Sequence, residues 1–110
     1  MAGQLDEAGS VTLDASGAGS VFLRPRTPRT RWRISNVAIE GDSGVEPEFR
    51  LYLGNAVPQQ QVASSLSGNT DSMAADFELR PGQRLCGRWS GGSPGALMTM
   101  SVYGAFDVAR

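Results

Sequence analysis

The sequence predicts an all-β protein, an antiparallel β-sandwich of the jelly-roll kind with seven or eight short strands. Gly, Pro and Ser interrupt the chain about every eight to twelve residues, the interval between turns that is typical of sandwiches and barrels. No window keeps a helical period, and several short segments alternate apolar and polar residues. A chain of 110 residues is near the size of one hydrophobic core. We therefore expect a single domain over residues 10–110, preceded by a short polar N-terminal arm over residues 1–9.

Short strands are predicted on either side of polar turns. Residues 10–14 (SVTLD) and 20–24 (SVFLR) flank the turn ASGAG and predict a first hairpin. Residues 48–54 (EFRLYLG) alternate apolar and polar side chains, as does an antiparallel strand with one face in water. A polar, weakly patterned stretch follows, and in it we expect one short strand near residues 61–66.

A long predicted strand, residues 31–40 (RWRISNVAIE), changes its parity in the middle. Trp32 and Ile34 share one face, whereas Val37 and Ile39 have the opposite parity. Because alternate residues of a strand point to opposite faces, all four can point inward only if the register changes near Ser35 and Asn36. The sequence therefore predicts a β-bulge or a bend at this point.

The second half of the chain predicts a hairpin and a final strand. Residues 76–89 (DFELRPGQRLCGRW) are expected to form two strands joined at Pro81–Gly82, because proline presets φ for one turn position and glycine supplies positive φ for the next. Residues 96–106 (ALMTMSVYGAF) follow a Gly-rich turn and predict the last strand. Its apolar residues on one face are Met98, Met100 and Val102.

Composition excludes several kinds of active site. All ten basic residues are arginine and there is no histidine, which removes Ser-His, Cys-His and zinc-His chemistry. The one cysteine, Cys86, has no internal disulfide partner and is predicted to be a small core residue. The N-terminal residues lack the pattern of a secretory signal, and no apolar run has the length of a membrane span. We expect no enzymatic activity, no cofactor, no metal, no small-molecule substrate and no membrane partner, with synthesis in the cytoplasm.

The strongest candidate site is an arginine cluster in "LRPRTPRTRWRIS", in a chain whose formal net charge is only −1. Its members are Arg24, Arg26, Arg29, Arg31 and Arg33. The spacing disfavours nucleic acid, because two prolines make the first half a kinked loop and no aromatic ladder accompanies the charges. A protein contact is favoured, since guanidinium groups pair with carboxylates across interfaces. The alternative that stays open is a solvated, charged edge that discourages unwanted strand pairing.

Other polar and aromatic groups favour structural interpretations. The acidic residues of "EGDSGVEPE" match no calcium loop and indicate a solvated turn. Asp71, Asp76 and Glu78 have no fixed separation that would make them a glycosidase pair. The large aromatic residues occupy inward strand positions, which favours core packing over stacking on a sugar. They are Trp32, Phe49, Phe77, Trp89 and Phe106.

A resemblance to a known group of proteins covers most of the chain, from about Ser10 to Gly104. The pattern "GSVFLRPRTPRTRWRISNVAI", then "FRLYLGN", "SGNTDS" and "LRPGQRLCGRWSGGSPGALMTMSVYG", resembles small β-sandwich virion proteins encoded by tailed phages of actinobacteria. The most specific portions are "GNTDS", "LRPGQRL" and "WSGGSPGA", which come in fixed order. No catalytic residues come with the resemblance.

The resemblance implies a structural component of the virion, either a capsid decoration (cement) protein or a tail-associated protein. Together with the arginine cluster, it leads us to expect attachment to the outer capsid surface through contacts with the major capsid protein and sister subunits in a homo-oligomer, with a trimer as one candidate. The polar arm is expected to contact a neighbouring chain. The alternative role is tail-associated recognition of a host-surface glycan.

Overall fold

The computed structural model describes residues 2–25, 27–54, 58–65 and 68–108. These residues form eight strands and one short 3-10 helix. The strands are β1 (Ala2–Thr12), β2 (Gly19–Leu23), β3 (Thr30–Gly41), β4 (Glu48–Leu53), β5 (Gln61–Ser65), β6 (Thr70–Leu79), β7 (Leu85–Ser90) and β8 (Leu97–Val108), and the helix is η1 (Pro58–Gln60).

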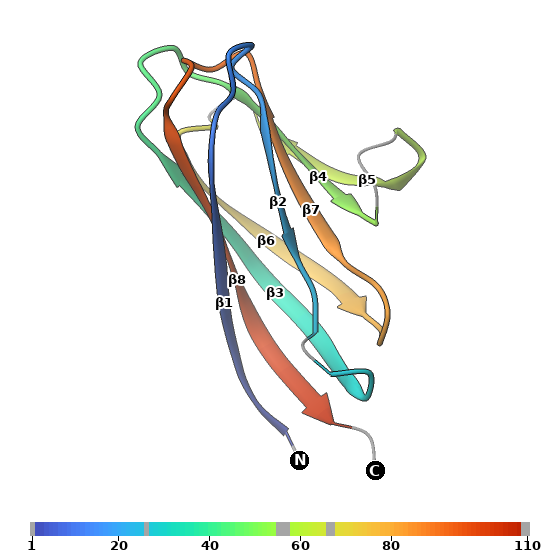
Figure 1. Cartoon of the computed structure of the whole chain (residues 1–110). Helices are drawn as coiled ribbons and strands as arrows, with labels where there is room; N and C mark the ends of the chain where they lie inside the picture. The colour runs from blue at the N-terminus through green and yellow to red at the C-terminus, as the bar shows by residue number, and fades with distance from the viewer. Residues whose placement is uncertain (1, 26, 55–57, 66–67, 109–110) are drawn as a thin grey trace.

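The strands form two antiparallel sheets that pack face to face (Figure 1). One sheet has the order β1-β8-β3-β6 and the other β2-β7-β4-β5, which is the strand order of a jelly roll. The predicted fold class is confirmed. The first sheet, here called the long-strand sheet, has strands of 10 to 12 residues. The second, the short-strand sheet, has strands of 5 or 6 residues.

The predicted hairpins are wrong in their pairing, although their turns are present. β1 pairs with β8 and β2 with β7, so residues 10–24 cross from one sheet to the other. The Pro81–Gly82 turn forms, with the Gln83 amide donating to the Arg80 carbonyl at 3.0 Å and Gly82 at φ 88°. It joins β6 of the long-strand sheet to β7 of the short-strand sheet. A tight turn reverses the chain, but the long-range partners of each strand decide the sheet to which it belongs.

The N-terminal residues form a strand where we expected an arm. From Ala2 to Thr12, every residue of β1 lies opposite a residue of β8, beginning with Ala2 opposite Asp107. Leu5 is buried, which anchors this otherwise polar segment to the core. The backbone hydrogen bonds to β8 therefore hold these residues in a strand, which their side chains alone do not indicate. The expected arm over residues 1–9 is corrected for residues 2–9, and Met1 lies outside the described residues.

The predicted irregularity in β3 is confirmed as a bulge. The register of β3 shifts between Ile34 and Asn36 against both β6 and β8. The Ser35 hydroxyl donates to the Tyr103 carbonyl at 3.2 Å. Beside the bulge, a Cβ on Gly104 would lie 1.9 Å from the Arg33 carbonyl oxygen, so this close approach of two backbones requires glycine.

The core lies between the two sheets. Phe49 and Trp89 of the short-strand sheet meet at a centroid distance of 4.9 Å, and the Trp89 indole donates to the Gly68 carbonyl at 2.9 Å. The inward positions predicted for β8 are confirmed, because Met98, Met100 and Val102 are fully buried. Trp32 is also buried, while Phe77 and Phe106 are partly buried against the same cluster. The aromatic residues thus pack in or against the core, as expected.

Candidate protein-binding surface

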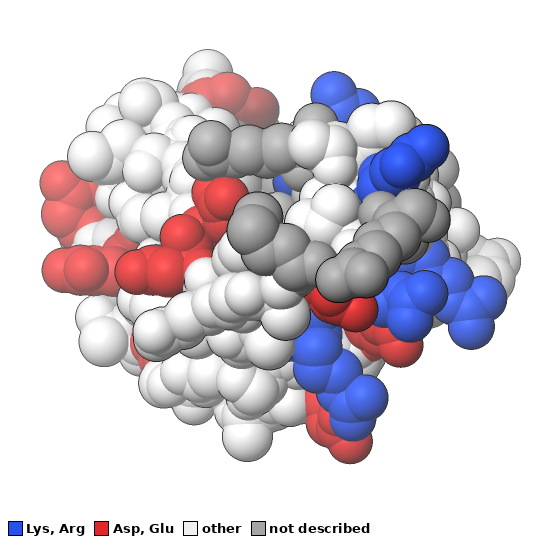
Figure 2. All heavy atoms as spheres, turned by 90° about the horizontal axis from the view of Figure 1, so that it is seen from below, with Lys and Arg blue, Asp and Glu red and all other residues white. Residues whose placement is uncertain are grey.

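The two ends of the sandwich carry different loops. One end, where the described N- and C-terminal residues lie, includes the described residues of 24–29 and residues 80–84, and we call it the arginine end (Figure 1). The opposite end is formed by residues 13–18, 42–47 and 91–96, and we call it the acidic end. Seen from the arginine end, basic atoms gather on one side of the molecule with some acidic atoms among them (Figure 2).

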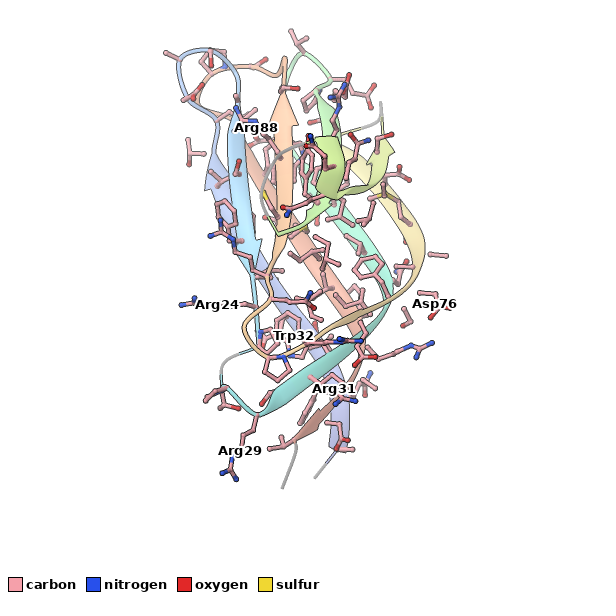
Figure 3. All side chains as sticks on the ribbon, turned by 90° about the vertical axis from the view of Figure 1, so that its right-hand side faces the viewer. Arg24, Arg29, Arg31, Trp32, Asp76 and Arg88 are labelled. Atoms are coloured by element: carbon pink, nitrogen blue, oxygen red, sulfur yellow. The ribbon has the colours of Figure 1, made fainter. Side chains whose placement is uncertain are left out.

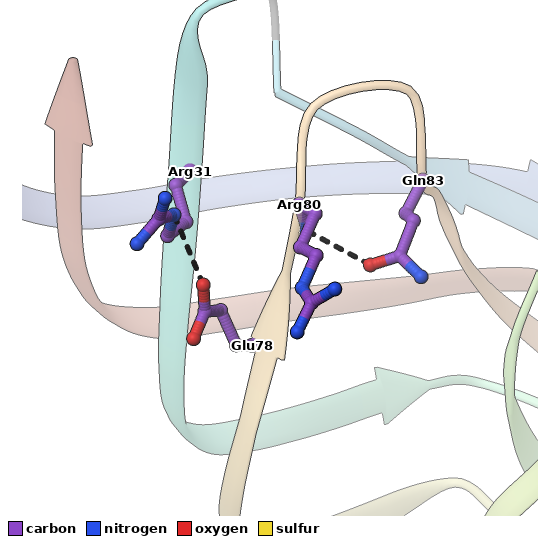
Figure 4. A network of polar contacts seen from close by, with 4 residues as sticks. All are labelled: Arg31, Glu78, Arg80 and Gln83. Atoms are coloured by element: carbon purple, nitrogen blue, oxygen red, sulfur yellow. Dashed lines mark hydrogen bonds and ion pairs between the residues drawn. The ribbon is translucent and has the colours of Figure 1, made fainter. Parts of the chain in front are cut away.

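Arg31 and Arg33 lie on the outer face of β3 and are both paired within the chain. The Arg31 Nε lies 3.0 Å from the Glu78 carboxylate (Figure 4), and the Arg33 Nη2 lies 2.6 Å from the Asp76 carboxylate. Both acids come from β6, the neighbouring strand. All four side chains are exposed by a third or more, so the pairs contribute little to stability. The pairs do reduce the net positive charge that this face presents to a partner.

Arg24 and Arg29 have more freedom to bind a partner. Both are exposed and point away from the sandwich (Figure 3), and neither makes an ion pair or side-chain hydrogen bond among the residues that the structure describes. The turn that carries Arg29 is closed by the Thr30 amide, which donates to the Thr27 carbonyl at 3.2 Å. Arg26, the fifth member of the predicted cluster, lies outside the described residues.

Two further arginines, Arg80 and Arg84, flank the Pro81–Gly82 turn at the same end and were not predicted as site residues. The Arg84 guanidinium lies 4.3 Å from the centroid of the exposed Phe22 ring, a cation–π contact. The Arg80 backbone amide donates to the Gln83 side-chain oxygen at 2.8 Å (Figure 4). The spacing "RPGQR" is visible in the sequence, but only the fold brings it beside residues 24–29.

A shallow depression joins the two loops of the arginine end. It has a volume of about 210 Å³ and is lined by Arg24, Pro25, Thr27, Pro28, Gly82 and Gln83. A Cβ added to Gly82 would meet nothing within 4 Å, so this wall of the depression is open. The arginine end therefore combines unpaired positive charge with a small depression that has both polar and apolar walls.

The acidic end is held together by hydrogen bonds between its loops. The Val45 amide donates to the Ser93 hydroxyl at 3.0 Å, and the Ser93 amide donates to the Ser43 hydroxyl at 2.7 Å. In the first loop, the Asp14 carboxylate accepts hydrogen bonds from the Ser16 hydroxyl and from the amides of Ser16 and Ala18. These bonds stabilise the ionised form and lower the pKa of Asp14, the Ser16 hydroxyl having the largest effect.

The described residues offer surfaces for binding and no recognisable catalytic arrangement. Among them, no group of three Cys, Asp or Glu side chains is placed to hold a metal ion. Cys86 is fully buried, and burial raises the pKa of its thiol. No helix in the described part of the chain is long and apolar enough to cross a membrane.

Comparison with known proteins shows the fold alone. No family model matches the chain, and no curated protein sequence does. Among solved structures, one similar chain belongs to a structure described as "Bacillus endospore appendages form a novel family of disulfide-linked pili". It has a TM-score of 0.54 and 13% sequence identity, and the similarity covers 99% of this chain and 89% of that one. The structural neighbour is thus a small β protein of a bacterial appendage.

Proposed function

We propose that this chain is a non-enzymatic structural protein of a virion that binds the outer capsid surface through its arginine end. The observation that carries the proposal is the exposure of Arg24 and Arg29 at one end of a jelly roll, without acidic partners among the described residues. The choice of a virion as the assembly rests on the resemblance to phage virion proteins. The structural neighbour supports a structural role, because it too belongs to a large protein assembly.

In the proposed mechanism, many weak contacts together stabilise the shell. Each copy places its guanidinium groups against carboxylates of the major capsid protein and of sister subunits, with bidentate geometry available to each arginine. Exposed ion pairs are individually weak. Many copies on one particle nevertheless hold neighbouring capsomers together, because a contact that opens at one point is kept in place by the others.

The proposed assembly is non-covalent. The structural neighbour belongs to pili that are disulfide-linked. Here the one cysteine, Cys86, is fully buried on β7 in the short-strand sheet. Burial also disfavours the thiolate that disulfide exchange needs. A disulfide between copies would require this part of the sheet to open, so we do not extend that linkage to this chain.

The test measures attachment to particles that lack the protein. Arg24→Ser combined with Arg29→Ser should weaken attachment about tenfold or more if the two contacts together contribute about 1.4 kcal/mol. The matched control is Arg50→Ser with Arg88→Ser, which removes two exposed arginines from the outer face of the short-strand sheet. Equal attachment of both double variants would refute the assigned surface. Absence of the chain from purified virions by quantitative mass spectrometry would refute the role.

A tail-associated role in glycan recognition is supported by a different surface. Tyr103 is 38% exposed on β8 and borders a depression of about 380 Å³ on the long-strand sheet. Its walls include Glu40, Thr70, Ser72 and Ser101, hydrogen-bonding groups beside an aromatic ring. A glycan array separates the two roles, because a signal that Tyr103→Ala abolishes supports the tail and its absence supports decoration. A copy number of the order of the major capsid protein's also supports decoration.

A further inference from the structure

The loops at the two ends of the molecule carry charges of opposite sign only. Residues 24–29 and 80–84 contain arginine as their one charged residue type, with four arginines in the described part. Residues 13–18, 42–47 and 91–96 contain three acids and no base. The acids are Asp14, Asp42 and Glu46. The two sets of loops lie at opposite ends of a molecule 46 Å long and at most 24 Å wide.

The acidic end presents an apolar projection beside its carboxylates. Val45 is 60% exposed and lies between Gly44 and Glu46 in the β3–β4 loop. Its backbone is held from both sides, because its amide donates to the Ser93 hydroxyl and its carbonyl accepts from the Ser43 hydroxyl. A second apolar side chain, Leu97, is 52% exposed, and its amide donates to the Asp42 carboxylate at 2.8 Å. The projection is therefore well ordered before any partner arrives.

The arginine end has the complementary form. Its depression of about 210 Å³ has Pro28 and Gly82 in its walls and Arg24 among its lining residues. The exposed Pro28 offers the projecting valine an apolar contact in this mixed lining, and the adjacent glutamate would then lie near Arg24. The short apolar contact and the charges would act together, since burial of the apolar groups excludes water from around the ion pair.

We propose that copies of this chain associate head to tail, with Val45 and Glu46 of one copy seated in the depression lined by Arg24, Pro28 and Gly82 of the next. Such a contact is heterologous, so it produces a ring if the rotation closes and a filament if it does not. The proposal depends on the chain alone and not on the virion role. A copy attached to any acidic surface by its arginine end would still expose an acidic end to another copy.

Association in free solution should be weak and dependent on salt. Only a few exposed charges and one small apolar group meet at each contact. Sedimentation velocity on the purified chain, at protein concentrations up to about the millimolar range where weak contacts are populated, should show species heavier than the monomer at low salt. These species should decrease at 1 M NaCl, where the screening length falls to about 3 Å.

Charge reversal gives the decisive test. Arg24→Glu with Arg29→Glu makes the receiving end acidic, and Glu46→Arg makes the projecting loop basic. Each variant alone should associate about tenfold less tightly than the wild type, since like charges then meet. A 1:1 mixture should associate again, because each variant offers an end that matches an end of the other. Arg50→Glu, which reverses an exposed charge on β4 outside both sets of loops, should leave association unchanged.

Three results would overturn the head-to-tail contact. These are a wild type that stays monomeric throughout the concentration range at low salt, single variants that associate as the wild type does, and a mixture no more associated than its components. Circular dichroism of each variant keeps a folding defect separate from a lost contact. Particle attachment is measured with virions and self-association without them, so a failure of the proposed virion role is distinguishable from a failure of this contact.

Discussion

The two ends of the sandwich are built by different means. At the acidic end, loops far apart in sequence bond to one another, as when the Leu13 amide donates to the Ala96 carbonyl and the Gly92 amide donates to the Gly17 carbonyl. At the arginine end, the backbone bonds from Thr30 to Thr27 and from Gln83 to Arg80 close each turn on itself, and among the described residues a single bond, from the Gly54 amide to the Arg84 carbonyl at 2.8 Å, joins residues far apart in sequence. We conclude that the acidic end contributes to the stability of the fold, whereas the arginine end is freer to vary and to bind.

A matched pair of glycine substitutions should show this difference most strongly. Gly17→Ala, at the acidic end, would place a Cβ 2.0 Å from the Gly92 carbonyl oxygen at φ 76°. Gly82→Ala, at the arginine end, has a similar φ of 88° but nothing within 4 Å of the new Cβ. We expect a loss of about 3 kcal/mol or more for the first and about 1 kcal/mol for the second in urea unfolding. Equal losses would contradict the contrast between the two ends.

Removal of one hydroxyl group at each end should again lower the free energy of unfolding more at the acidic end, by a smaller difference than the glycine substitutions give. Ser43 is 7% exposed, and its hydroxyl accepts from the Ser93 amide and donates to the Val45 carbonyl. Ser43→Ala leaves these groups without their partner and should cost about 1 to 3 kcal/mol. Thr27→Ala, at the arginine end, removes a single hydrogen bond, to the hydroxyl of the buried Thr30, and should cost about 1 kcal/mol. Both values come from the same urea titrations.

Removal of the ion pairs on β3 should change the free energy of unfolding less again. Arg31→Ser with Arg33→Ser removes both pairs to β6, but the arginine side chains are 57% and 65% exposed. Surface substitutions of this kind usually change stability by no more than about 0.5 kcal/mol each. A loss larger than about 2 kcal/mol would show that these pairs hold β6 to β3, and would make them poor candidates for a partner contact.

Local features of the fold were predictable from the sequence, because they depend on neighbouring residues. The parity change between Ile34 and Val37 predicted the bulge, and the alternation around Met98 and Met100 predicted the inward face of β8. The Pro81–Gly82 turn also followed from its two residues alone. Each of these predictions uses only the period of a strand or the φ preference of a turn residue.

Strand partners and the composition of the site were not predictable, because they depend on long-range pairing. β1 is a strand through its pairing with β8, which places Ala2 opposite Asp107 from the other end of the chain. Pairing of β3 with β6 places Glu78 and Asp76 beside arginines that looked free in the sequence. The crossing of the chain between sheets likewise brings the Pro81–Gly82 turn beside Arg24 and Pro28, which gives the arginine end its depression and two further arginines.

The smallest expected effect is a pH dependence at the acidic end. The pKa of Asp14 is lowered in the folded protein by hydrogen bonds from Ser16 and Ala18, so the carboxylate stabilises the fold above its ordinary pKa, 3.8. This contribution is lost as the pH falls from that value through the lower pKa of the folded state. The stability advantage of the wild type over Asp14→Asn should therefore be constant near neutral pH and shrink below 3.8, as urea midpoints at several pH values would show. An advantage that grew on acidification would mean that the Asp14 carboxylate is not the group that the loop stabilises, and that this loop is held by its backbone bonds alone.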